Sequence, residues 1–259
     1  ALRYEMRHRD YYRTLAEKES DVQQKSKYEE MAARIERVPA NPATNFIDAL
    51  QSISFMYLCL HAEDVGGHTL GRIDQILYPY YKKDIDEGVI TKEEAEEYFF
   101  DWWLKFNLSH IILETDSESW ALPNTETDHT HNNGLVWTGF TDSITREKHT
   151  DDGYVIDIGG VDADGNDGVN DISWLVIKAL NELNTLGMKP VFKLNEKTSP
   201  EFAKACYETN SKIKYGFPAI TFDRNAVRAF RQEPNNKYTE EDLNNIVHIG
   251  CVELAVPGK

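Results

Sequence analysis

The sequence has few cysteines, and none of them lie at the spacing of a metal or redox pair. Only Cys59, Cys206 and Cys251 occur among its 259 residues, and no two form a CxxC pair. An odd cysteine count without such pairs argues against a disulfide framework and against a cysteine-based zinc site. We therefore expect a protein of the reducing cytoplasm.

Long apolar runs and positive charge are also lacking. No stretch of 18 apolar residues occurs, so the sequence predicts no transmembrane helix, and the first residues lack the apolar segment of a signal peptide. The chain has 28 Lys and Arg against 44 Asp and Glu, a formal net charge of −16. This balance disfavours a nucleic-acid backbone or an anionic membrane as the partner. The acidic residues are spread along the chain, as on a solvated surface.

Motifs for nucleotides and metals are missing as well. The chain contains no GxGxxG, GxxxxGK[ST] or GxSxG pattern, so neither a nucleotide fold nor a serine hydrolase is indicated. Histidines and acidic residues gather at His61 with His68, at His129 with His131, and over 162–167. None of these sets has the spacing of a zinc or calcium site. We expect no bound metal, a solvated or substrate-rim loop at His129, and a tight turn over 162–167.

Hydrophobic periodicity predicts helices in the first part of the chain. Residues 2–37 have helix-forming composition up to the break at 38–42, and Thr44 or Asn45 can begin a second helix. A further helix is expected over 74–81, interrupted at Pro79. Thr91 and Glu94 form a capping box before a helix whose aromatic residues are typical of a core. Hydrophobic residues make up 41% of the chain, enough for a substantial core.

Strands and helices alternate in the second part. Short apolar segments at 154–161, 190–194 and 218–222 predict strands, and 246–252 is expected to be a fourth extended segment. Helices are expected over 172–186 and from Ser199, and 240–245 is helical or a turn. This alternation predicts an α/β architecture with helices outside a sheet or barrel. We find no internal repeat or linker, and expect 1–259 to be one domain.

One pair of residues suggests chemistry by its spacing. A cysteine in an apolar strand is usually a small buried hydrophobe. However, residues i and i+2 of an extended segment point to the same side, so Cys251 and Glu253 would project together. Gly250 would let the backbone approach another group closely. On one substrate carbon, the sulfur could take a hydrogen and the carboxylate a proton.

The same tetrad resembles a known family. The motif GCVE at 250–253 is similar to that of glycyl radical enzymes of the dehydratase and lyase branch. Further blocks resemble the family in the same order along the chain: VPANPA (38–43) with FIDALQ (46–51), GRIDQILYPYY (71–81), and GGVD (159–162) with NDIS (170–173). Together these matches outweigh the interpretation of Cys251 as a buried hydrophobe.

The resemblance implies both a fold and a mechanism. The fold would be part of a ten-stranded α/β barrel, built from two five-stranded halves and surrounded by helices, with the Cys loop in its centre. A glycyl radical would take the thiol hydrogen of Cys251, and the thiyl radical would take one from a small-molecule substrate. Glu253 would act as acid or base. A separate activating enzyme with an iron–sulfur cluster and S-adenosylmethionine would install the radical, and a homodimer is expected.

The family's C-terminal radical glycine motif is not among these residues. We therefore expect 1–259 to be an incomplete catalytic barrel domain from a longer protein, without its glycyl radical domain. The segment 123–153 also looks longer than the family leads us to expect, as for a specificity loop or an insertion.

Several reactions remain open. Formate acetyltransferases of the family use two adjacent cysteines, whereas Cys251 lies between Gly250 and Val252. Elimination of water, an amine or sulfite is the first interpretation, and decarboxylation of an arylacetate the second. A degenerate, non-catalytic homologue is the alternative from another class, which the presence of both Cys251 and Glu253 disfavours.

Asp157 is the third candidate site residue. It is a charged residue in the apolar strand before Gly159 and Gly160, which is unusual in a buried parallel strand. A buried carboxylate requires a partner. That partner is either a polar substrate inside the barrel or another group of the protein.

Overall fold

The computed structural model describes residues 2–62, 69–115, 154–185, 187–213, 216–233, 235, 237–250 and 253–259. The chain divides into two compact units, Ala1–Asp64 with Tyr80–Tyr98 and Val65–Pro79 with Phe99–Lys259. Within the described parts, no helix is both long and apolar enough to cross a membrane. His68, His129, His131 and Cys251 lie outside the described residues, as does the long loop expected before residue 154.

The first unit begins with two helices, α1 (Leu2–Lys18) and α2 (Val22–Arg37). The single helix predicted over 2–37 is therefore wrong. The carboxylate of Glu19 accepts the backbone N–H of Asp21 at 3.0 Å, and Asp21 in turn accepts the N–H of Gln24 at 2.8 Å. Such local acceptors compete with helical hydrogen bonds and favour a new helix start.

Helix α3 (Phe46–Ala62) begins after Asn45, as predicted, because the Asn45 side chain accepts the N–H of Asp48 at 2.8 Å. The buried carboxylate of Asp48 also accepts two hydrogen bonds from the Arg37 guanidinium, at 2.8 and 2.5 Å, and one from the Thr44 hydroxyl at 2.9 Å. Burial by itself would raise the pKa of Asp48, but these hydrogen bonds and the charge of Arg37 lower it below its usual value.

Helices α4 (Ile73–Asp86) and α5 (Lys92–Thr115) follow. The predicted interruption at Pro79 is wrong, since α4 continues through it. A proline removes a single helical N–H, and the helix is long enough to continue on both sides. The capping box is confirmed by hydrogen bonds between Thr91 and Glu94 at 2.8 and 3.1 Å. The aromatic face of α5 is a core, as expected, with Phe99, Trp102, Trp103 and Phe106 buried.

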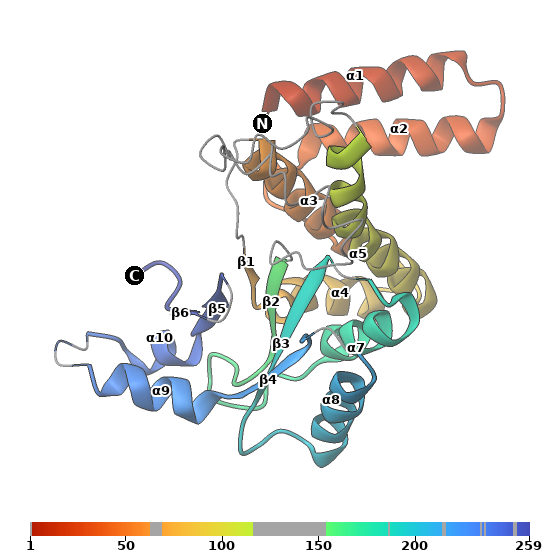
Figure 1. The fold of residues 1–259 in the computed structure, drawn as a ribbon. Helices are drawn as coiled ribbons and strands as arrows, with labels where there is room; N and C mark the ends of the chain where they lie inside the picture. The colour runs from red at the N-terminus through yellow and green to blue at the C-terminus, as the bar shows by residue number, and fades with distance from the viewer. Residues whose placement is uncertain are drawn as a thin grey trace, which may run out of the picture. The chain divides into compact units, whose positions relative to one another are not determined.

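The second unit contains a parallel sheet, which confirms the predicted α/β class. Its strands β1 (Thr69–Gly71), β2 (Tyr154–Gly159), β3 (Met188–Leu194) and β4 (Ala219–Phe222) are paired in this order. Helix α7 (Asp171–Leu183) connects β2 to β3, and α8 (Pro200–Lys212) connects β3 to β4. Both helices lie on one side of the sheet in Figure 1.

The predicted helix starts in this unit are confirmed. The side chain of Asn170 accepts the N–H groups of Ile172 and Ser173, and Ser199 accepts that of Phe202 at 3.1 Å. The segment 162–167 is a turn, as expected, in which Asp162 accepts two backbone N–H groups.

Three short elements follow the sheet: α9 (Asp223–Arg231), α10 (Glu240–Asn244), and a hairpin of β5 (Val247–Ile249) with β6 (Glu253–Ala255). Figure 1 draws the hairpin on the side of the sheet opposite to α7 and α8. The sequence did not indicate α9, because its few apolar residues are scattered among arginines. Val227 and Phe230 pack against a small core that includes Leu243, and this contact stabilises the helix.

Candidate active site

The two described residues of the GCVE motif lie at the end of β5 and the start of β6: Gly250 directly follows β5, and Glu253 is the first residue of β6. The strands pair antiparallel, with Val247 opposite Ala255 and Ile249 opposite Glu253. The extended segment predicted over 246–252 is confirmed at Val247–Ile249 and wrong at Gly250, because β5 ends at Ile249 and Gly250 is in a turn. The alternation of an extended strand does not continue from 249 to 253. Cys251 itself is outside the described residues, between Gly250 and Glu253 in the sequence.

Glu253 folds back over Gly250. Gly250 has φ +55°, in the left-handed region that favours glycine. A Cβ atom built on Gly250 would lie only 2.8 Å from Oε2 of Glu253. Because Gly250 has no side chain, the Glu253 carboxylate has room to lie against it. Gly250 directly precedes Cys251 in the sequence.

We expect Gly250→Ala to lower turnover of the full-length protein strongly while the protein still folds. The new methyl group would displace the Glu253 carboxylate, and a displacement of about 1 Å in a reacting group can lower rates about 10²-fold. Steady-state kinetics and thermal unfolding would be measured together.

Gly88→Ala is the matched control for this substitution. Gly88 has a similar φ, +67°, and nothing lies within 4 Å of a Cβ built there. Gly88→Ala therefore introduces the backbone strain of about 1–2 kcal/mol, but its new methyl group does not collide with another side chain. Equal losses of turnover in the two variants would contradict the role given to the space above Gly250.

Asp157 contacts the same hairpin. It is completely buried on β2. Its Oδ2 accepts the backbone N–H of His248 at 2.8 Å, and its Oδ1 lies 2.5 Å from Nδ1 of the His248 imidazole. A carboxylate oxygen accepts hydrogen bonds, so in this contact the ring donates from Nδ1. Both oxygens of Asp157 are thereby directed at one residue, three positions before Cys251.

Two more side chains hold the segment that leads into the hairpin. The ammonium group of Lys193, which is 2% exposed, donates to the carbonyl of Ile246 at 2.6 Å and pairs with Asp223 at 3.2 Å. The guanidinium of Arg72 donates to the carbonyl of Asn244 at 2.9 Å. Positions 244, 246 and 248 are therefore each bound by a charged side chain. These side chains come from β2, from β3 and from the residue before α4. Together they hold residues 244–248, which precede Cys251 in the sequence.

Behind these contacts lies a buried polar network around Gly159. Arg72 donates to the Gly159 carbonyl at 2.8 Å, and Asp74 accepts the Gly159 N–H at 2.7 Å and the Ser173 hydroxyl at 2.7 Å. Burial raises the pKa of Asp74, while the hydrogen bonds from Gly159 and Ser173 and the charge of Arg72 oppose that shift. The blocks 71–81, 159–162 and 170–173 of the sequence meet here.

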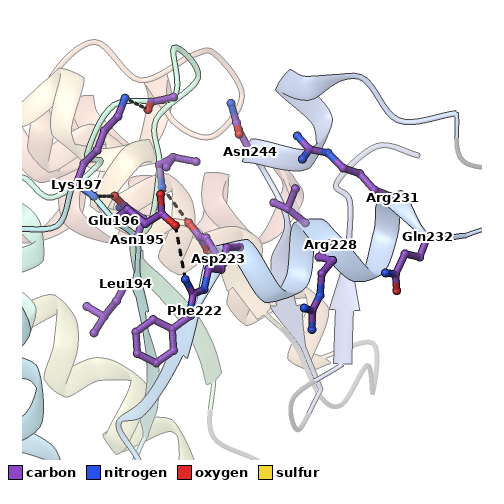
Figure 2. A pocket seen from close by; sticks show the side chains of 14 residues that line it. Leu194, Asn195, Glu196, Lys197, Phe222, Asp223, Arg228, Arg231, Gln232 and Asn244 are labelled. Carbon is purple, nitrogen blue, oxygen red and sulfur yellow. Dashed lines mark hydrogen bonds and ion pairs between the residues drawn. The ribbon is translucent and has the colours of Figure 1, made fainter.

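A separate pocket opens beside α9. Its volume is about 570 Å³, and Figure 2 shows Glu196 and Lys197 across from the side chains of Arg228 and Arg231 on α9. Lys197 donates to the carbonyl of Gly165. The residues that line the pocket do not include Asp157, His248 or Glu253. The pocket adjoins the contacts that hold the hairpin through Asp223, which pairs with Lys193, and Asn244, whose carbonyl accepts from Arg72. No group of metal ligands occurs among the described residues.

Sequence reasoning did not assign a role to Lys193 or His248. Each is a charged or polar residue within an apolar segment, Pro190–Leu194 and Ile246–Ile249. The signal that singled out Asp157 was therefore present at both positions. What the sequence could not supply was the pairing, because Asp157 and His248 are 91 positions apart.

Comparisons with known proteins agree with this architecture. The family model described as pyruvate formate lyase-like matches residues 1–259. The isethionate sulfite-lyase of Bilophila wadsworthia is 29% identical over 255 residues, which are 98% of this chain and 27% of that protein. The 4-hydroxyphenylacetate decarboxylase glycyl radical subunit of Clostridioides difficile is 26% identical over 242 residues, 93% of this chain and 24% of that protein.

Among solved structures, one of 1,2-propanediol dehydration in Roseburia inulinivorans is similar, with a TM-score of 0.75 and 25% identity. It covers 100% of this chain, which corresponds to 29% of that protein. The chain thus spans between 24 and 29% of the length of these three proteins. The parallel sheet of β1–β4 corresponds to part of the barrel of these proteins.

Proposed function

Because the chain belongs to the pyruvate formate lyase-like family, we propose that the full-length protein is a glycyl radical lyase acting on a small polar substrate. Cys251 would form the thiyl radical, and Glu253 would be its acid–base partner. The observation that supports this proposal best is the Glu253 carboxylate folded over Gly250, next to the cysteine in the sequence. A lone cysteine beside a carboxylate suits radical elimination, in which one hydrogen atom and one proton move.

The proposed reaction has three steps. The Cys251 thiyl radical takes a hydrogen atom from a substrate carbon, which restores the S–H bond and leaves a carbon radical. A water, amine or sulfite group then leaves the neighbouring carbon, while Glu253 takes the proton of the substrate hydroxyl group and passes it to the leaving group. The product radical finally takes the hydrogen atom back from Cys251, so the thiyl radical is regenerated.

The radical itself would come from outside this cycle. A glycine elsewhere in the full-length protein would carry it at rest, and an activating enzyme with an iron–sulfur cluster and S-adenosylmethionine would install it. The relative named as a glycyl radical subunit supports this proposal. We further propose that the protein acts in the cytoplasm as a homodimer.

Decarboxylation of an arylacetate is the second candidate, favoured by the similarity to 4-hydroxyphenylacetate decarboxylase. Elimination is preferred because the isethionate sulfite-lyase and the 1,2-propanediol structure both concern small hydroxylated compounds. An acyl transfer of the formate acetyltransferase type would need a second adjacent cysteine, and Gly250 and Val252 flank Cys251.

The test is activation followed by a substrate panel. The full-length protein would be activated without oxygen, and radical content would be measured by electron paramagnetic resonance. It would then receive isethionate, 1,2-propanediol or 4-hydroxyphenylacetate. We expect a radical signal and release of sulfite or an aldehyde from a hydroxylated compound. Carbon dioxide released from 4-hydroxyphenylacetate alone would favour the second candidate. A protein that accepts no radical would contradict both.

A further inference from the structure

A buried carboxylate and a buried imidazole form one contact directly before the radical motif. Asp157 is 0% exposed and His248 is 5% exposed. Strand β2 is paired with β1 on one side and β3 on the other, so its backbone position is fixed by the sheet. A charged group inside such a strand destabilises the protein unless a partner is supplied. Among the described residues, His248 is the partner of both Asp157 oxygens.

The two hydrogen bonds between Asp157 and His248 fix the register of β5 relative to the sheet. One oxygen of Asp157 holds the backbone of His248 at 2.8 Å, and the other holds its ring at 2.5 Å. If β5 slid by one residue along its axis, Val247 or Ile249 would face the carboxylate instead. Neither side chain can donate a hydrogen bond, and the buried charge would be left with a single partner. The pair therefore selects one position of β5 relative to the sheet.

The other two anchors of this segment are less specific. Lys193 and Arg72 both bind backbone carbonyls, at Ile246 and Asn244, and every residue has such a carbonyl. Only the contact at His248 recognises a side chain, and it is the anchor nearest to Cys251.

We propose that Asp157 and His248 are positioning residues that set the location of Cys251 for hydrogen-atom transfer, an inference that rests on the proposed role of Cys251. The sequence left two partners open for Asp157, a substrate or a group of the protein, and the contact with His248 supports the second. Asp157 holds His248 in place, and His248 is part of β5, three residues before Cys251. The contact therefore sets the position from which the Cys251 thiol meets the radical.

A substrate-free measurement tests this inference. The thiol hydrogen exchanges with solvent, so in D₂O reversible transfer between Cys251 and the glycyl radical would replace the hydrogen on the radical carbon by deuterium. The doublet of the radical would then collapse, because deuterium has a much smaller hyperfine coupling. The rate of this collapse per radical reports on how well the thiol is placed, separately from radical yield and protein stability.

The variants are Asp157→Asn, His248→Ala and His248→Asn in the full-length activated protein. We expect the alanine variant to slow the exchange about 10²-fold, as for a reacting group displaced by about 1 Å. The asparagine at 248 carries its amide nitrogen on Cγ, as histidine carries Nδ1, and can donate to Asp157 from nearly the same place. It should restore most of the rate, whereas a role of His248 that needs Nε2 would not be rescued.

Asp167→Asn is the control for the loss of a carboxylate. Asp167 lies in the 162–167 turn and accepts hydrogen bonds from Asn195 at 3.2 Å and from Thr198 at 3.4 Å, residues that do not contact Asp157 or His248. It should leave the exchange rate unchanged. Wild-type exchange in both Asp157→Asn and His248→Ala would overturn the inference while leaving the proposed function intact. If the wild-type doublet does not collapse and Cys251→Ser turns over, the proposed function itself fails.

Discussion

Cys251→Ser is expected to abolish turnover while leaving the fold and the glycyl radical signal intact. The proposed cycle needs a bond that gives up and recovers a hydrogen atom. The S–H bond of cysteine is weak enough for a glycyl radical to break, whereas the O–H bond of serine is much stronger. The substitution is otherwise small. Anaerobically activated full-length protein would be assayed for product and, by electron paramagnetic resonance, for radical content.

The other cysteines provide the controls. Cys59→Ser changes a partly exposed thiol of the first unit, and it should retain wild-type turnover. Cys206 is fully buried, and burial raises the pKa of its thiol to about 12, so it stays protonated and chemically quiet. Turnover by Cys251→Ser at more than a trace would remove Cys251 from the proposed mechanism, and loss of turnover in Cys59→Ser would point to a general effect of cysteine replacement.

Glu253→Gln is expected to lower turnover by about 10²–10⁴-fold, the range for a lost general acid or base. Glutamine keeps the shape of the side chain, so it can occupy the space above Gly250, but it cannot exchange a proton at neutral pH. Because hydrogen-atom transfer at Cys251 does not require a proton, the deuterium exchange of the radical should persist. The loss should therefore appear in kcat for elimination and not in radical chemistry.

Two variants sharpen this result. Glu241→Gln makes the same change of charge on the exposed surface of α10 and should behave as wild type. Glu253→Asp keeps the carboxylate on a shorter side chain, so part of the activity should return. If Glu253→Gln turns over at the wild-type rate, the carboxylate has a structural role at Gly250 and the acid–base assignment is withdrawn.

Local signals in the sequence determined much of the fold. The helix starts at Asn45, Thr91, Asn170 and Ser199 were predictable because a capping side chain bonds to a backbone group two or three residues away. The strands β2 and β3 were predictable because buried parallel strands are short apolar runs. Strand β4 is less buried, but its sequence is also a short apolar run. The family blocks also gave Cys251 and Glu253 as candidates from the sequence alone.

Contacts between distant segments decided the rest. The turn at Gly250 replaced the expected extended segment, because β6 pairs back on β5. Helix α9 depends on the core around Leu243, which no local pattern reveals. Above all, the sequence marked Asp157 as a buried charge in need of a partner, but its pairing with His248 across 91 positions depends on how the hairpin packs against the sheet. A sequence shows which groups must be satisfied when buried, and only the packing of distant segments decides which groups satisfy them.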